Sequence, residues 1–161
     1  MAAVVGGAPD VVLAAISQAG AAPANFNGPG QIVAGGTLDA LDRLAQTPPH
    51  RARVVRLGVA GAFHTPLMAQ AEHALREELD QVRIKNADVP FVCNRDGLAL
   101  TDGRRIIDAV IRQVAQPVRW DLVLERFAAH GIGRHFELAP AGVLTGLAKR
   151  GLKGAALEQA A

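Results

Sequence analysis

The sequence predicts an α/β fold that begins with a small four-stranded sheet. Short apolar runs alternate with amphipathic stretches along the 161 residues, and over residues 2 to 59 their order is β-α-β-β-α-β. Half of the residues are hydrophobic but only 4% are aromatic. The core must therefore consist of many small aliphatic contacts rather than ring clusters.

The first 59 residues contain the signals of four strands and two helices. The turn NGPG separates two of the strands, Gly20 ends the first helix, and Thr37 is expected to cap the second. This order is that of a ferredoxin-like sheet with both helices on one face. The strands are expected at 2–5, 22–26, 31–36 and 53–59, and the helices at 10–19 and 37–45.

The rest of the chain predicts mostly helices. Two strands are too few for a parallel sheet, which needs several neighbouring strands and cover on both faces. The helices are expected at 65–82, 102–116, 118–131 and 143–150, with a helical tail at 153–161, and the two strands at 89–94 and 134–138.

Composition excludes several classes of function. Seventeen basic residues against fifteen acidic ones give a net charge of +2, too balanced for a typical nucleic-acid-binding protein. The single cysteine, Cys93, allows no internal disulfide or cysteine zinc site and fits a reducing, cytoplasmic setting. The sequence has no long apolar run, signal peptide, HExxH motif or phosphate-binding loop. We expect neither a membrane, nor a nucleic acid, nor a metal, nor a cofactor.

Among the five histidines, His64 has the most informative position. It lies in GVAGAFHTPLM, directly before Thr65 and Pro66, which are expected to open a helix. The positive end of that helix would keep the imidazole neutral, as a general base requires. The alternative is a histidine that only satisfies a loop.

The segment NFNGPGQ, residues 25–31, contains two asparagines beside a glycine-rich turn. The carboxamides of Asn25 and Asn27 could line a binding cleft. A polar hairpin without a ligand explains the same residues, so both interpretations stay open.

Four segments, taken in order, resemble a known enzyme family. NFNGPGQIVAGG, GVAGAFHTPLM, IRQVAQPVRW and FELAPAGVLTGLAKR are similar to the second half of the malonyl-CoA:acyl carrier protein transacylases. The resemblance covers about residues 1 to 152 and extends to the acyltransferase domains of polyketide synthases. It implies a ferredoxin-like small subdomain at 1–59, the C-terminal part of an α/β-hydrolase-like large subdomain at 60–152, and a tail at 153–161.

The resemblance also implies a reaction and roles for residues. A serine in a GHSxGE motif attacks the malonyl-CoA thioester, a histidine accepts the serine proton, and the malonyl group passes to the carrier's pantetheine thiol. His64 matches the histidine, and Gln113 matches a position whose main-chain carbonyl orients its ring. The implied partners are malonyl-CoA and acyl carrier protein, in fatty acid or polyketide synthesis.

Phe63 matches a family position linked to substrate choice. GAFH resembles the HAFH form of malonyl-selective acyltransferases, in which the phenylalanine crowds the α-carbon of the substrate. Gly61 departs from the first histidine of that form. Packing under the loop is the alternative role for Phe63.

The sequence lacks one essential part of the family pattern. It has no GxSxG motif, and its single serine is Ser17, in the first predicted helix. The family's oxyanion segment and its malonyl-binding arginine are also absent, and Arg112 is not assumed to replace that arginine. Met1 matches an internal family position, so we expect a truncated or split enzyme that needs an N-terminal half and is inactive alone.

A second function class stays open. A non-catalytic ferredoxin-like module could bind an acidic carrier protein through basic side chains, although such charges are often only solvated. The candidates for this contact are Arg104, Arg105, Lys149, Arg150 and Lys153.

Overall fold

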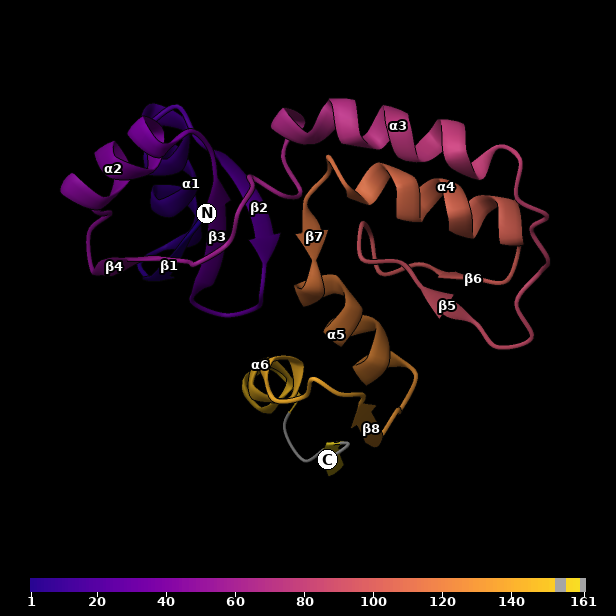
Figure 1. Cartoon of the computed structure of the whole chain (residues 1–161). Coiled ribbons are helices and arrows are strands. Elements are labelled where there is room, and N and C mark those ends of the chain that lie inside the picture. The colour runs from indigo at the N-terminus through magenta and orange to yellow at the C-terminus, as the bar shows by residue number, and fades with distance from the viewer. Residues whose placement is uncertain (153–155, 160–161) are drawn as a thin grey trace.

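The chain folds into a mixed α/β structure in which one sheet joins the first and second parts of the sequence (Figure 1). The computed structural model describes residues 1–152 and 156–159. Its elements, in chain order, are β1 (Ala2–Gly6), α1 (Pro9–Gln18), β2 (Ala22–Phe26), β3 (Gln31–Gly35), α2 (Leu38–Gln46), β4 (Ala52–Arg56), the 3-10 turn η1 (Pro66–Met68), α3 (Ala69–Leu79), β5 (Phe91–Val92), β6 (Ala99–Leu100), α4 (Gly103–Gln113), β7 (Val118–Arg119), α5 (Trp120–Ala129), β8 (Arg134–Glu137), α6 (Val143–Gly151) and β9 (Ala156–Gln159).

The main sheet has the strand order β4-β1-β3-β2-β7. Its first four strands are antiparallel neighbours, which confirms the predicted β-α-β-β-α-β order. The sequence did not predict β7, which pairs in parallel with β2 through Asn25 and Val118. This fifth strand carries the sheet across the predicted boundary between 1–59 and 60–152.

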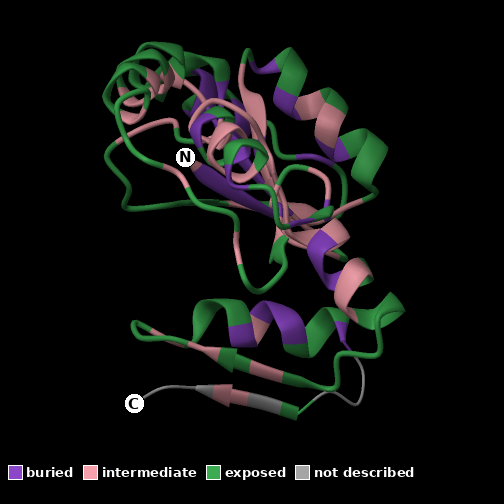
Figure 2. Ribbon diagram, turned by 90° about the vertical axis from the view of Figure 1, so that its right-hand side faces the viewer, coloured by how far each residue is buried: buried purple, intermediate pink, exposed green. Residues whose placement is uncertain are grey.

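Alternation along β1 and β3 gives the sheet two buried faces. Ala2 and Val4 face both helices and pack with Ile16 of α1 and Leu44 of α2. The residues between them in each strand, such as Ala3 in β1 and Val33 in β3, form a smaller cluster on the opposite face. Figure 2 shows most of the buried residues in this part of the molecule.

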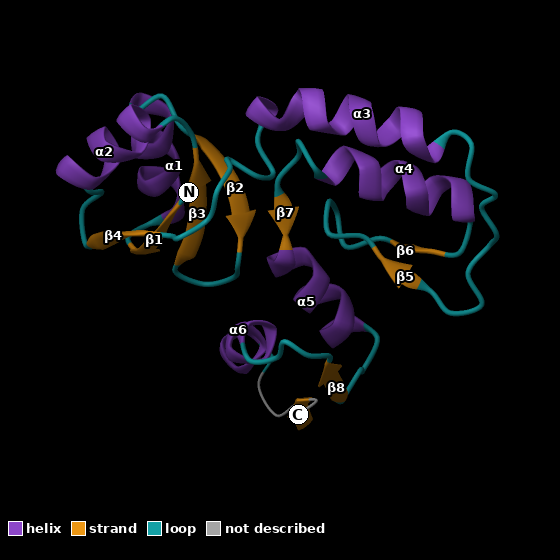
Figure 3. Cartoon of the chain, in the orientation of Figure 1, coloured by secondary structure: helices purple, strands orange, loops and turns teal. Residues whose placement is uncertain are grey.

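The second part of the chain consists of smaller layers. Helices α3 and α4 lie side by side, and the β5–β6 hairpin lies against α4 (Figures 1 and 3). Helix α5 leads from β7 to β8, and its Leu124 packs against Ala148 and Leu152 at the end of α6.

Several predicted boundaries are wrong. The helix expected at 65–82 starts with the 3-10 turn η1 and ends at Leu79, and the strand expected at 89–94 has two residues. Two further two-residue strands, β6 and β7, were not predicted. Strands this short give no measurable alternation in sequence.

The predicted helical tail is also wrong where the structure describes it. Residues 156–159 form β9, which pairs in parallel with β8, and Arg134 contacts Glu158 at 2.8 Å. Ala, Leu, Glu and Gln favour helices, but pairing with a distant strand overrides that weak preference. Residues 153–155 and 160–161 of the predicted tail lie outside the described residues.

No helix in the described part of the chain is long and apolar enough to cross a bilayer.

Candidate functional site

His64 lies in the loop between β4 and η1 with an unusual backbone conformation. Its φ is +62°, in the left-handed region that side chains other than glycine seldom adopt. Such a conformation costs about 1–3 kcal/mol and persists only where the surroundings fix it. The next residue, Thr65, is buried and donates its hydroxyl to the Ala62 carbonyl at 2.6 Å.

A glycine in the sheet makes room for this loop. A Cβ atom at Gly35 of β3 would lie 2.6 Å from Cγ2 of Thr65, which is closer than packed carbon atoms approach. The absence of a side chain at Gly35 therefore allows Thr65 to pack on the sheet beside His64.

Two main-chain carbonyls at the end of α4 hold His64. The His64 amide donates to the Val114 carbonyl at 3.0 Å, and its ring Nδ1 lies 2.7 Å from the Gln113 carbonyl oxygen. The last carbonyls of a helix have no partner within the helix, so they are free to accept these bonds. Because a carbonyl only accepts, Nδ1 must carry the proton, and Nε2 of the neutral ring is then the basic nitrogen.

His64 precedes a helical segment, as predicted, but the predicted Thr65 side-chain cap is wrong. The Thr65 side chain caps no helix, and α3 begins only at Ala69, after the 3-10 turn. The helix end that contacts the imidazole is the carbonyl end of α4. The hydrogen bond to the Gln113 carbonyl therefore fixes which ring nitrogen carries the proton in the neutral form.

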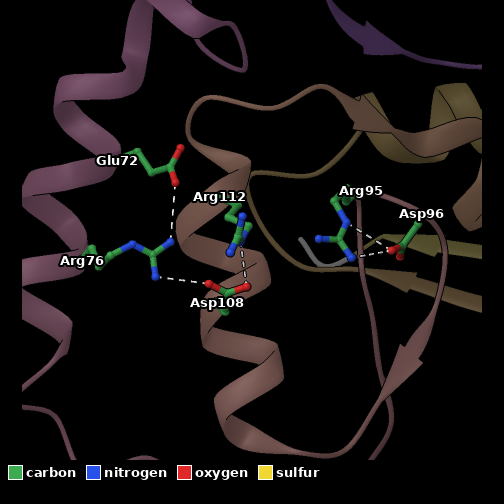
Figure 4. Close-up of polar contacts among 6 residues, drawn as sticks. All are labelled: Glu72, Arg76, Arg95, Asp96, Asp108 and Arg112. Carbon is green, nitrogen blue, oxygen red and sulfur yellow. Dashed lines mark hydrogen bonds and ion pairs between the residues drawn. The ribbon is translucent and has the colours of Figure 1, made fainter.

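A network of ion pairs fixes α3 against α4 (Figure 4). Arg76 of α3 contacts Asp108 of α4 at 3.1 Å, and Asp108 also accepts from Arg112 at 2.8 Å. The hydrogen bond from Arg112, with that from Arg76, holds the pKa of the Asp108 carboxyl below its usual range. His64 precedes α3 and Gln113 ends α4, so the network keeps the two sides of the histidine contact together.

A cavity of about 440 Å³ opens beside His64 on the sheet face opposite α1 and α2. Its polar lining includes Asn25, Asn27 and Asn94, and Phe63 lies on its wall. The apolar lining residues are Met1, Val33, Leu57, Val59, Val118, Val143, Leu144 and Leu147, with Trp120 beside them.

The structure brings the predicted site residues together. One cavity is lined by Asn25, Asn27, Phe63 and His64. Gln113 is not part of the lining, but its main-chain carbonyl contacts the His64 ring. Asn27 donates its Nδ2 to Gln31 Oε1 at 3.3 Å within the β2–β3 turn. Phe63 is 41% exposed.

Gly61 explains how the loop accommodates Phe63. A Cβ atom at Gly61 would lie 3.3 Å from the Phe63 ring, so a larger residue there would press on the phenyl group. At this position, which departs from the HAFH form, the absence of a side chain leaves room for the Phe63 ring on the cavity wall.

Other candidate residues lie elsewhere. Ser17 is an exposed residue of α1, and Arg112 pairs with Asp108 outside the cavity lining. Arg104 and Arg105 begin α4, whereas Lys149 and Arg150 end α6, in a different part of the molecule (Figure 1). Lys153 lies outside the described residues.

Among the polar and aromatic residues that line the cavity, sequence reasoning missed two. Asn94 follows the buried Cys93, and Trp120 begins α5 after the PVR segment. Trp120 is the last residue of the motif IRQVAQPVRW, and its place in that motif could have marked it as a site residue. Asn94 had no such signal, because its proximity to His64 depends on contacts between distant segments.

Comparisons with known proteins agree with the resemblance. No family model matches the chain. The malonyl CoA-acyl carrier protein transacylase of Mycobacterium tuberculosis H37Rv is 43% identical over 154 residues, which cover 96% of this chain and 51% of the relative.

Solved structures give the same result for the fold. The crystal structure of MCAT from Mycobacterium tuberculosis superposes with a TM-score of 0.94 at 41% identity, over 99% of this chain and 53% of that one. A malonyl-transacylase in complex with its type II PKS acyl-carrier protein superposes with a TM-score of 0.85 at 30% identity, over 99% and 53% of the two chains. The chain is homologous to the malonyl-CoA:acyl carrier protein transacylases and spans about half the length of these relatives.

Proposed function

We propose that the chain supplies the general base and one wall of the substrate cavity of a malonyltransferase. The reaction moves a malonyl group from coenzyme A to the pantetheine thiol of an acyl carrier protein. The observation that carries the proposal is the contact of His64 Nδ1 with the Gln113 carbonyl, because it leaves Nε2 as the proton acceptor of a residue that lines a cavity.

In the first half of the reaction, a serine hydroxyl attacks the thioester carbonyl of malonyl-CoA. His64 Nε2 takes the hydroxyl proton, and the carbon–sulfur bond breaks to give malonyl-serine and coenzyme A, whose thiolate receives that proton. In the second half, His64 takes the proton of the carrier thiol, the thiolate attacks the malonyl-serine ester, and the released serine oxygen receives that proton from His64. The reaction requires no metal and no cofactor besides its two substrates.

The serine in this proposal lies outside the 161 residues. Ser17 is on α1, which packs on the helix-covered face of the sheet, whereas the His64 cavity is on the opposite face. We therefore propose that the 161 residues alone do not turn over malonyl-CoA.

Asn25 and Asn27 are proposed to bind the substrate arm. Coenzyme A and the carrier protein present the same pantetheine, whose amide groups can donate to and accept from carboxamides. Phe63 is proposed to lie against the α-carbon of the malonyl group. A phenyl ring there would disfavour substrates that carry an α-methyl group.

The test uses a reconstituted enzyme. The chain is joined to the segment of the M. tuberculosis relative that it does not match, and malonyl transfer to holo carrier protein is measured. His64→Ala is expected to lower kcat by about 100-fold to 10,000-fold, the usual contribution of a general base.

The control is His73→Ala, which removes an exposed histidine of α3 that contacts only Glu77 among the described residues. This variant should transfer malonyl groups at the parental rate. A His64→Ala enzyme within a few-fold of the parent would contradict the assignment of His64 as the base.

A further inference from the structure

We propose that Asn94 is a positioning residue for His64, because it clamps the loop whose carbonyls hold the histidine. The importance of that position for catalysis rests on the proposed function. The clamp itself rests only on contacts within the described residues.

Asn94 joins the two sides of the loop at 114–117, between α4 and β7. Its side-chain Nδ2 donates to Gln113 Oε1 at 3.3 Å, just before the loop. Its main-chain carbonyl accepts from the Arg119 amide at 2.6 Å, just after the loop. One residue from the β5–β6 hairpin therefore connects the end of α4 to β7.

The clamped segment is the one that holds His64. The Gln113 carbonyl contacts the imidazole Nδ1, and the Val114 carbonyl accepts from the His64 amide. The left-handed backbone of His64 depends on such contacts to persist. Movement of the 113–114 segment would release both the ring and the backbone of the histidine.

The Gln113 side chain has no other polar support in the described part of the chain. Its Nε2 atom is buried without a hydrogen-bond partner there, so the carboxamide is oriented by Asn94 alone. Removal of Asn94 would leave both ends of a buried amide unpaired. That is an unfavourable state which the loop can relieve only by moving.

The hairpin turn that carries Asn94 is itself well fixed. The preceding residue, Cys93, is 2% exposed, its amide donates to Leu98, and its carbonyl accepts from Gly97. Asp96 accepts from the Leu98 amide and pairs with Arg95 within the same turn (Figure 4). Asn94 can therefore hold the loop in place rather than follow its motion.

The test measures the tautomer of the His64 ring by nitrogen-15 NMR of the whole chain. In the unmodified chain the neutral form of the ring should carry its proton on Nδ1 rather than on Nε2. Asn94→Ala should shift the ratio of the two tautomers about threefold to tenfold toward the Nε2-protonated form, as expected for the loss of one hydrogen bond.

Gln113→Leu removes the other partner but keeps the main-chain carbonyl, and it should produce the same shift. In the double variant the two effects should not add, because both substitutions break the same side-chain hydrogen bond. Additive effects would overturn the proposal, since they would mean that Asn94 and Gln113 act on His64 separately.

The matched control is Asn86→Ala. Asn86 Oδ1 accepts from the Gly103 amide at 3.1 Å, so this variant also loses one asparagine hydrogen bond to α4, but at the opposite end of the helix. It should lower the unfolding temperature and leave the His64 tautomer unchanged. If Asn94→Ala also lowers the unfolding temperature without changing the His64 tautomer, Asn94 is merely structural and the inference fails.

This readout needs no acyl transfer. A failed transfer assay would count against the proposed function and leave the tautomer result standing. An unchanged tautomer in Asn94→Ala would count against the clamp alone.

Discussion

At the scale of single residues, the site depends on main-chain groups more than on side chains. His64 is held by two carbonyls, and its neighbour Thr65 packs where Gly35 has no side chain. The family resemblance indicated a main-chain carbonyl at Gln113 beside the ring. The second carbonyl, at Val114, and the left-handed backbone of His64 became visible only in the fold.

Phe63 gives the residue-scale prediction. In the reconstituted enzyme, Phe63→Ser should raise kcat/KM for methylmalonyl-CoA relative to malonyl-CoA, because a small side chain leaves room for the α-methyl group. One methyl group in a pocket changes discrimination by about 10-fold to 200-fold. The measurement is the ratio of the two kcat/KM values.

Phe91→Ser is the control for this substitution, because Phe91 is an exposed phenylalanine of β5 outside the cavity lining. It should leave the ratio unchanged. A Phe63→Ser enzyme with the parental ratio would mean that Phe63 only packs under its loop.

At the scale of elements, local signals predicted what is local. Thr37 caps α2 as predicted, with its hydroxyl accepting from Ala40, and the alternation in the first strands matches the two faces of the sheet. The two-residue strands β6 and β7 and the strand β9 could not be predicted, because pairing with another strand, rather than a local pattern, defines them. The sequence also did not predict the hydrogen bonds that Glu137 makes across the connection from β8 to α6.

Glu137, at the end of β8, caps the beginning of α6 from outside the helix. Its carboxylate accepts from the Thr145 hydroxyl at 2.6 Å and from the amides of Gly142, Leu144 and Thr145. The Thr145 hydrogen bond, followed by the amide bonds, lowers the pKa of Glu137 to about 2 against the opposing effect of desolvation. This cap fixes the turn that places Leu144 on the cavity wall.

The element-scale prediction concerns pH. The folded pKa of Glu137 is below its ordinary value of 4.5, so its contribution to stability is complete above that value and is lost as pH falls toward about 2. Glu137→Gln should destabilise the chain at pH 7, because a carboxamide cannot accept all four bonds, and should remove this part of the acid dependence. Urea unfolding between pH 7 and pH 2 measures both effects.

Glu78→Gln is the matched control, because Glu78 is an exposed residue of α3 with no hydrogen bond to another described side chain. Its stability should follow that of the parent at every pH. Equal acid dependence in Glu137→Gln and the parent would show that the cap does not stabilise the fold.

At the scale of the whole molecule, the cavity is assembled from segments far apart in sequence, and part of its surroundings is open. Asn25, His64, Asn94 and Leu144 come from four different regions of the chain. The β8–α6 region beside the cavity exposes several large apolar side chains, as a surface does where further protein packs against it. These residues are Phe136, Leu138, Val143 and Leu144.

The last prediction follows from the two faces of the sheet. When the chain alone is incubated with malonyl-CoA, mass spectrometry should find no malonyl group on Ser17, because α1 and the His64 cavity lie on opposite faces and a serine without a base is a weak nucleophile. In the reconstituted enzyme a single malonyl adduct should appear on the added segment and disappear when holo carrier protein is supplied. Malonyl-Ser17 formed at a rate that His64→Ala abolishes would mean that the 161 residues contain their own nucleophile, contrary to the separation of base and serine that the fold imposes.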